Sequence, residues 1–321
     1  MDSVSQLVLG ASVGMAVMGR KAPLWKSALV GGFCGTLPDL DVFLDHGDAI
    51  RNMTLHRTES HALVWLTLLS PLLAWLLAGV VKQRFQWIQW WPAVWLALIT
   101  HPLLDLMTVY GTQLGLPFTD YPWAIGSIYI VDPLYTLSLI ICLIVALWRR
   151  EPRWSRAGLT LSTGYLLWSM AAQGIALYQV APQVAHQLDV KSHLLVTPTA
   201  FNTLVWRVVA VTPEHYYEGY WSLLAPHRPL QLSMHDRGAA LYQQLKGDAH
   251  VERVAWFSHG FFAMQQRDGK LFISDLRMGE APDFTFTFDL GAPQARNPHP
   301  SRLASSRPSL TQTWRHFRQR L

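Results

Sequence analysis

Long apolar stretches alternate with short charged loops over the first 186 residues. Four stretches approach or reach the roughly 17–25 apolar residues that a helix needs to cross a bilayer; they cover residues 62–81, 90–104, 133–148 and 157–185. Two earlier stretches, residues 4–19 and 23–37, are shorter and rich in Gly and Ala, small residues that let helices pack closely. The pattern predicts an α-helical multi-pass membrane domain of about six spans over residues 1–186.

The pattern changes after residue 186, where short apolar or aromatic stretches alternate with turns. The stretch Thr285–Phe288 alternates with period two, as a half-buried strand does. The other candidate strands lie within residues 193–197, 204–212, 254–265 and 270–275, with residues 284–290 completing the set. We therefore predict a β-rich soluble domain over residues 187–290. Residues 291–321 are rich in Pro, Ser and Arg, which predicts a disordered basic tail that ends in a short basic helix.

Charge supports a membrane location and predicts an orientation. Charged residues make up 15% of the chain, against about 25% in ordinary soluble domains. Basic side chains gather in alternate loops: Arg20, Lys21 and Lys26; Lys82 and Arg84; and Arg149, Arg150, Arg153 and Arg156. Because basic loops stay in the cytoplasm, the acidic loops and the C-terminal domain are expected to face outward. The net charge of the chain is +5, but no basic, aromatic-rich block indicates nucleic acid as a partner.

Ionisable residues gather at the outward ends of the predicted spans, where they are costly and need partners. His101 and Asp105 are four residues apart, which places both on one face of a helix. The other candidates are Asp39, Asp41, His56 and His61. Imidazole and carboxylate groups together suit zinc, with manganese or iron as alternatives. The sequence predicts that these six residues bind a divalent metal, one ion or more; the alternative is a structural polar network.

Two further residues have a functional and a structural interpretation. Asp132 precedes Pro133 and is either a further ligand or a group that holds a histidine, but an Asp before Pro is often a helix cap. Arg57 would neutralise a phosphoryl oxygen, or would pair with a carboxylate of its own loop such as Asp45, Asp48 or Glu59.

The same residues resemble a known family, the bacterial membrane-bound metal-dependent hydrolases of the YdjM-like group. The resemblance extends to about residue 225 and rests on these motifs: residues 35–41 (GTLPDLD), His56-Arg57 with His61, residues 100–105 (THPLLD), 110–114 (YGTQL), 131–136 (VDPLYT) and 217–220 (YEGY). Thr58 and Ala62 depart from the family pattern, which has Gly and then Ser or Thr. The resemblance implies a bacterial inner-membrane location. It also implies a distant similarity to zinc phospholipases C and single-strand nucleases, and hence phosphoester hydrolysis.

The leading hypothesis is a membrane-bound hydrolase that uses metal-activated water. The membrane location suggests a lipid or lipid-linked phosphoester as substrate and the bilayer as partner. One rival is a metal or proton transporter, because intramembrane carboxylates and histidines also line ion pathways. A second rival is a non-catalytic membrane anchor that contains a structural metal.

Overall fold

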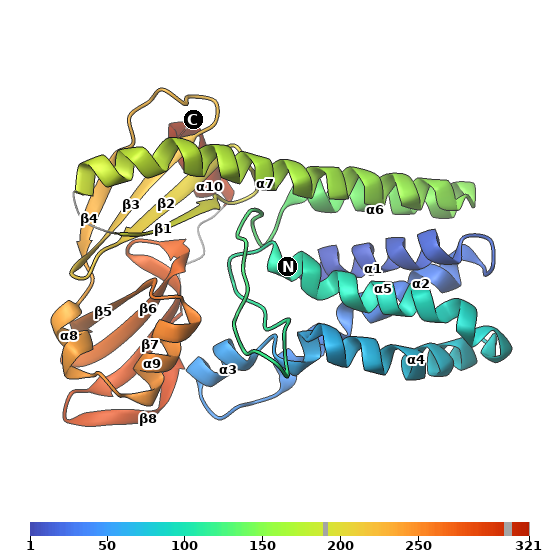
Figure 1. Ribbon diagram of the computed structural model, residues 1–321, viewed down its shortest axis with the longest axis horizontal. Coiled ribbons are helices and arrows are strands. Elements are labelled where there is room, and N and C mark those ends of the chain that lie inside the picture. The colour runs from blue at the N-terminus through green and yellow to red at the C-terminus, as the bar shows by residue number, and fades with distance from the viewer. Residues whose placement is uncertain (189–191, 305–309, 321) are drawn as a thin grey trace. The chain divides into compact units, whose positions relative to one another are not determined.

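The computed structural model of the chain describes residues 1–188, 192–304 and 310–320. It divides into two compact units (Figure 1). The first unit is helical and contains residues 1–43 and 57–170. The second unit contains residues 44–56 and 171–321 and carries all the strands of the two sheets. A helical N-terminal region followed by a β-sheet-rich C-terminal domain is therefore confirmed.

The helical unit places a helix on each of the six predicted apolar stretches. These helices are α1 (Ser3–Met18), α2 (Leu24–Thr36), α4 (Leu63–Val80), α5 (Trp87–Leu106), α6 (Pro133–Arg149) and the first part of α7 (Pro152–Leu188). Three short 3-10 helices join them: η1 (Pro38–Phe43), η2 (Glu59–His61) and η3 (Arg84–Gln86). Residues 107–132 between α5 and α6 are not helical.

Helices α1 and α2 pack with their backbones in contact. A Cβ atom added to Gly10 would lie 2.3 Å from the carbonyl oxygen of Gly31, and one added to Gly35 would lie 2.5 Å from that of Gln6. Only glycine tolerates these distances, which explains the small residues in the two shortest apolar stretches. The close packing brings Gln6 of α1 and Gly35 of α2 to the same end of the unit as the polar cluster described below.

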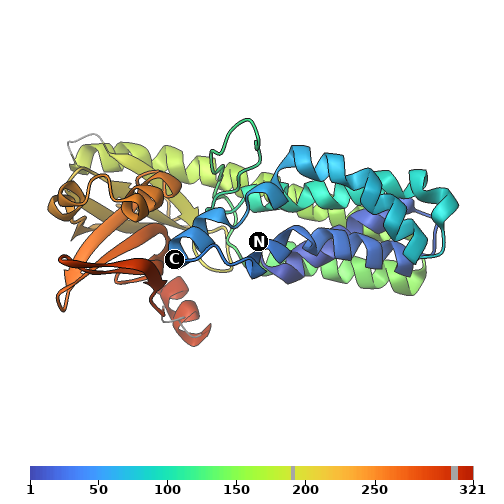
Figure 2. The ribbon, with the colours of Figure 1, turned by 90° about the horizontal axis from the view of Figure 1, so that it is seen from below.

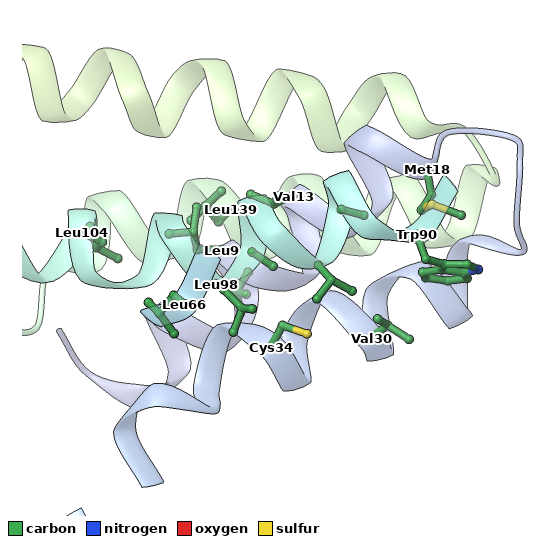
Figure 3. Packing of buried hydrophobic residues seen from close by; sticks show 14 of the residues in the cluster. Leu9, Val13, Met18, Val30, Cys34, Leu66, Trp90, Leu98, Leu104 and Leu139 are labelled. Atoms are coloured by element: carbon green, nitrogen blue, oxygen red, sulfur yellow. The ribbon is translucent and has the colours of Figure 1, made fainter. Parts of the chain in front are cut away.

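The core of the helical unit surrounds α5. Trp90 and Leu98 of α5 are fully buried and belong to one cluster with residues of α1, α2, α4 and α6; Trp90 lies near Met18 (Figure 3). Helix α4 lies alongside α5 in both views (Figure 1 and Figure 2). Helix α5 packs against α1, α2 and α4, so it lies at the centre of the helical unit.

The prediction of six membrane spans is not supported. Among the described residues, only α4 is both long and apolar enough to cross a membrane. Helices α1 and α2 have 16 and 13 residues, and at about 1.5 Å per residue they are shorter than the roughly 30 Å hydrocarbon core. Helices α5 and α7, with 20 and 37 residues, are long enough to cross a membrane but are less apolar than a span requires.

The second unit contains two four-stranded antiparallel sheets, in the orders β1-β2-β3-β4 and β5-β6-β7-β8. The strands are β1 (His193–Pro198), β2 (Val205–Val211), β3 (His215–Ser222), β4 (Leu232–Asp236), β5 (Phe262–Arg267), β6 (Lys270–Glu280), β7 (Asp283–Ala292) and β8 (Ala295–Arg302). The unit also includes the short helices α3 (Ala49–Leu55), α8 (Ala239–Gln244) and α9 (Ala249–Phe257), and α10 (Leu310–Arg320).

Several details differ from the sequence prediction, and β3 and β4 lie outside the predicted strands. The predicted strand at 254–265 begins inside α9, which Asp248 caps by accepting the N–H groups of His250 and Val251, so β5 starts only at Phe262. Residues 295–302 of the predicted disordered tail pair with β7 as β8. Helix α7 continues past the predicted boundary at 186 to Leu188. Of the predicted tail, residues 305–309 lie outside the described residues.

Candidate metal centre

Four side chains of the helical unit converge on one point. They are Asp39 from η1, His61 from η2, and His101 and Asp105 from α5. The Nε2 atoms of His61 and His101 lie 3.1 Å apart. Each of these Nε2 atoms lies 3.4 Å from Asp39 Oδ1 and 3.4 Å from Asp105 Oδ2. One ligand atom from each residue therefore faces the same small volume.

These spacings fit a tetrahedral metal ion. In a regular tetrahedron the edge is about 1.6 times the centre-to-corner distance, so metal–ligand distances of about 2.0–2.2 Å require ligand atoms roughly 3.3–3.6 Å apart. Five of the six edges are 3.1–3.4 Å long. Two imidazoles and two carboxylates also form a donor set that zinc accepts.

His101 is held in the orientation that a metal ligand requires. Its Nδ1 atom lies 2.6 Å from the carbonyl oxygen of Gly35. Because a carbonyl oxygen only accepts, Nδ1–H donates, and in the neutral ring the lone pair is on Nε2, which faces the cluster. His101 and Asp105 lie on one helical face, four residues apart and within 3.4 Å of each other, as their spacing predicted.

Asp105 has one occupied and one open carboxylate oxygen, and it is fully buried. Its Oδ1 atom accepts from Gln6 Nε2 at 3.0 Å, contacts Arg57 Nη2 at 3.1 Å and binds the amino nitrogen of Met1. Among the described residues its Oδ2 atom has no hydrogen-bond partner, although it is buried. A buried carboxylate oxygen without a hydrogen bond needs an explanation, and a bound cation would supply one.

Asp39 presents a second open carboxylate oxygen. Its Oδ1 atom is buried and lacks a hydrogen-bond partner within the described part of the chain. Burial alone would raise the pKa of Asp39, but the imidazoles of His101 and His61, 3.4 Å from Oδ1, hold that pKa well below its usual range. The carboxyl group is therefore ionised at neutral pH, as a metal ligand must be.

Asp41 lies on the Nδ1 side of the His61 ring, whereas the cluster lies on its Nε2 side. Its Oδ2 atom accepts from the Arg57 backbone N–H at 3.0 Å and from Ser60 Oγ at 2.6 Å. Ser60 Oγ in turn lies 2.8 Å from His61 Nδ1. Asp41 and Ser60 thus orient the imidazole of His61 from its Nδ1 side, as outer carboxylates commonly do at metal sites.

Arg57 is buried, with 3% of its surface exposed. It pairs with Asp105 on α5, and no ion pair described for it involves Asp45, Asp48 or Glu59, the alternatives that the sequence offered. It also lies over the ring of Tyr110 at 4.8 Å. Its Nε and Nη1 atoms are buried and have no hydrogen-bond partner within the described residues. The site therefore combines open carboxylate oxygens with open guanidinium donors.

Asp132 and His56, like Asp41 and Arg57, lie outside the four-residue cluster. Asp132 caps α6: its Oδ1 atom accepts from the N–H groups of Leu134 and Tyr135, and its Oδ2 atom accepts from the Tyr165 hydroxyl. No contact described for Asp132 involves a histidine. Its observed role is therefore that of a helix cap, the structural alternative given by the sequence. His56 follows α3 in the second unit, and its role as a ligand stays a prediction.

Sequence reasoning gave no role to Gln6, Ser60 or the Gly35 carbonyl. In the sequence, Gln6 is a polar amide inside an apolar stretch, and this position could have indicated a role for it. In the structure its side chain is fully buried. Ser60 and Gly35 act through contacts that depend on tertiary packing and leave no pattern in the sequence.

Comparison with known proteins places these residues in a family. A family model described as YdjM inner membrane protein matches residues 1–176, which include every residue of the cluster. The chain is also similar to the uncharacterized protein YfhP of Bacillus subtilis (strain 168), at 24% identity over 234 residues, which cover 68% of each chain. No solved structure matches.

Proposed function

The chain belongs to the YdjM inner membrane protein family, and we propose that it is a membrane-bound metal-dependent hydrolase. We propose further that its substrate is a phosphoester of a lipid or lipid-linked molecule. The observation that carries this proposal is the four-atom cluster of Asp39, His61, His101 and Asp105 beside the buried guanidinium of Arg57.

The four cluster residues would hold a divalent ion, zinc in the first place and manganese or iron as alternatives. Such an ion supplies a Lewis acid that polarises a phosphoryl oxygen and makes water nucleophilic near neutral pH. Gln6 and Arg57 fix Oδ1 of Asp105 and leave Oδ2 available as the atom that would bind the ion. The Gly35 carbonyl and Ser60 hold the two imidazoles in the same way.

Arg57 supports a phosphoester as the reacting group. Its Nε and Nη1 donors are buried without hydrogen-bond partners among the described residues. Each open N–H group of a charged guanidinium is a strong donor for a phosphoryl oxygen. Charge that develops on those oxygens in the transition state would be stabilised there, in a site shielded from water.

The surroundings of the cluster support a lipid substrate. On η1, the element that carries Asp39, the side chains of Leu40, Val42 and Phe43 are 51%, 62% and 82% exposed. Exposed apolar side chains beside a polar site are typical of a surface that meets lipid. Acyl chains held there would bring the phosphoester of a lipid close to the cluster.

Charged residues on either side of α4, the candidate span, support one orientation in the inner membrane. Lys82 and Arg84 follow its C-terminal end, whereas Glu59 precedes its N-terminal end. By the positive-inside rule the Val80 end faces the cytoplasm. His61, which lies two residues before the first residue of α4, would then lie at the outer face. We propose that the C-terminal domain is also extracytoplasmic, which requires the chain to cross the membrane again after α4.

The rival functions make different demands on the structure. A transporter needs a polar path across the helical unit, but the buried side chains of α5 from Trp90 to Leu98 are apolar. A structural zinc site has four protein ligands and no open position. Four ligands are present here, so the metal-anchor alternative must be separated from the hydrolase by experiment.

The test is metal analysis of the purified protein together with a screen of soluble phosphomonoesters and phosphodiesters. The hydrolase predicts bound metal, metal-dependent turnover of at least one substrate, and loss of both in Asp105→Ala. Bound metal with no turnover of any phosphoester, in detergent or on lipid vesicles, would identify the site as structural.

A further inference from the structure

Helix α3 belongs to the second unit, although its sequence lies between two segments of the metal centre. Residues 44–56 cluster with the C-terminal domain, whereas η1 before them and Arg57 after them belong to the helical unit. Within the second unit α3 packs against α9 and β8. Ile50 and Met53 of α3 are buried, so the helix is part of the core of that unit.

Polar contacts fix α3 to α9 at both of its ends. At the N-terminal end, buried Asp48 accepts the Arg51 N–H as a helix cap and lies 3.4 Å from His250 Nε2. At the C-terminal end, Arg253 Nη1 donates to Thr54 Oγ1 at 3.3 Å. His250 and Arg253 are three residues apart on α9, which places them on one face of that helix.

The chain enters and leaves α3 directly from the metal centre. Phe43, the last residue of η1, is bonded to Leu44, and His56 is bonded to Arg57. The two boundaries also meet, because the Arg57 N–H donates to Asp41 Oδ2 at 3.0 Å. The segment is thus a closed loop, whose ends form the site and whose middle is held by the C-terminal domain.

We propose that the C-terminal domain is a positioning domain for the metal centre and acts through α3. By holding α3 it restricts the backbone of η1, which carries Asp39 and Asp41, and the backbone of Arg57. A loop that joined Asp41 to Arg57 without this anchor would sample many conformations. Ligand and anion-binding groups must be held to within about half an ångström to work. His250 and Arg253 are then positioning residues.

The test uses the full-length protein and changes only the C-terminal side of the contact. His250→Ala combined with Arg253→Ala removes both polar contacts to α3 and leaves residues 1–188 unchanged. Glu252→Ala is the matched control, because Glu252 lies on the same helix, is half-buried and accepts from the Gly247 N–H. Hydrogen–deuterium exchange is measured for the peptides that cover residues 39–43, 49–55 and 57–62, together with the melting temperature.

We expect exchange at 49–55 to accelerate about tenfold in the double variant, with a similar acceleration at 39–43 and 57–62. The control and the melting temperature should change little. Faster exchange at 49–55 without a change at the two site segments would overturn the proposal, as would unchanged exchange at all three. A general acceleration with a lowered melting temperature would also count against it, because that indicates loss of folding.

The consequence for catalysis rests on the proposed hydrolase function, but the exchange measurement does not. If the protein hydrolyses no substrate, the coupling between α9 and the site segments is still visible by exchange. Binding of zinc alone, measured by chelator competition, should weaken about tenfold in the double variant and remain unchanged in Glu252→Ala.

Discussion

Replacing Arg57 by Lys separates the anion-binding role of this residue from its structural role. In the structure Nη2 of Arg57 contacts Asp105 Oδ1 at 3.1 Å, and Nε and Nη1 have no hydrogen-bond partner among the described residues. A lysine ammonium can keep the ion pair with Asp105 but cannot also place N–H donors where Nε and Nη1 of the planar guanidinium lie. The substitution therefore preserves the positive charge and removes the two open N–H donors of the guanidinium.

The size of the effect follows from the hydrogen bonds that are lost. A hydrogen bond to a charged group contributes about 1.5–3 kcal/mol. If the open donors of Arg57 bind phosphoryl oxygens in the transition state, kcat/KM should fall by roughly ten- to 150-fold, since each factor of ten corresponds to about 1.4 kcal/mol. Metal content should stay at the wild-type level, because Arg57 is not a ligand and Asp105 keeps a cationic partner.

The assay is steady-state hydrolysis of the best soluble phosphoester from the substrate screen, with elemental analysis of the same preparations. Arg51→Lys is the control: Arg51 is an arginine of α3 whose side chain is 55% exposed and pairs with Asp48. Exposed ion pairs contribute about 0–1 kcal/mol, so this variant should stay close to wild type. Full activity of Arg57→Lys would remove Arg57 from the mechanism. A loss of activity that parallels a loss of metal would show that Arg57 acts by orienting Asp105.

Three further predictions test the site and the fold. Asp105→Ala should lower bound metal at least tenfold, whereas Asp132→Asn should keep it, because Asn also caps helices; metal loss in Asp132→Asn, by elemental analysis, would contradict the cap assignment. Gly10→Ala should lower the melting temperature, because its Cβ would lie 2.3 Å from the Gly31 carbonyl oxygen; an unchanged melting temperature would contradict this close packing. A reporter active only in the periplasm and fused after position 200 should be active, and activity of a cytoplasmic reporter there would invert the orientation.

Local patterns in the sequence were sufficient to locate the helices of the first unit. Hydrophobic stretches report where a helix lies, because a helix buries its apolar face against its neighbours. The pairing of His101 with Asp105 was predictable for the same reason: a spacing of four residues puts two side chains on one helical face whatever the rest of the fold does. The sheet-rich character of the C-terminal domain also followed from local alternation.

Long-range packing decided the remainder. Asp39, His61 and His101 lie far apart in the sequence, and no local rule states which carboxylate meets which imidazole. The same packing separated Asp39, which faces Nε2 of His61, from Asp41, which lies on the Nδ1 side of that ring. Their sequence contexts are nearly identical, and only the direction in which η1 turns distinguishes them.

The assignment of α3 to the C-terminal domain is the clearest case of tertiary control. Nothing within residues 44–56 specifies a partner more than 190 positions away, yet Arg253 contacts Thr54. Apolar burial and buried hydrogen bonds are satisfied by whichever surface the complete fold brings close. The sequence by itself determined the elements and the types of chemical group in this protein, whereas the tertiary structure decided which groups meet, because that choice depends on the free energy of the whole chain.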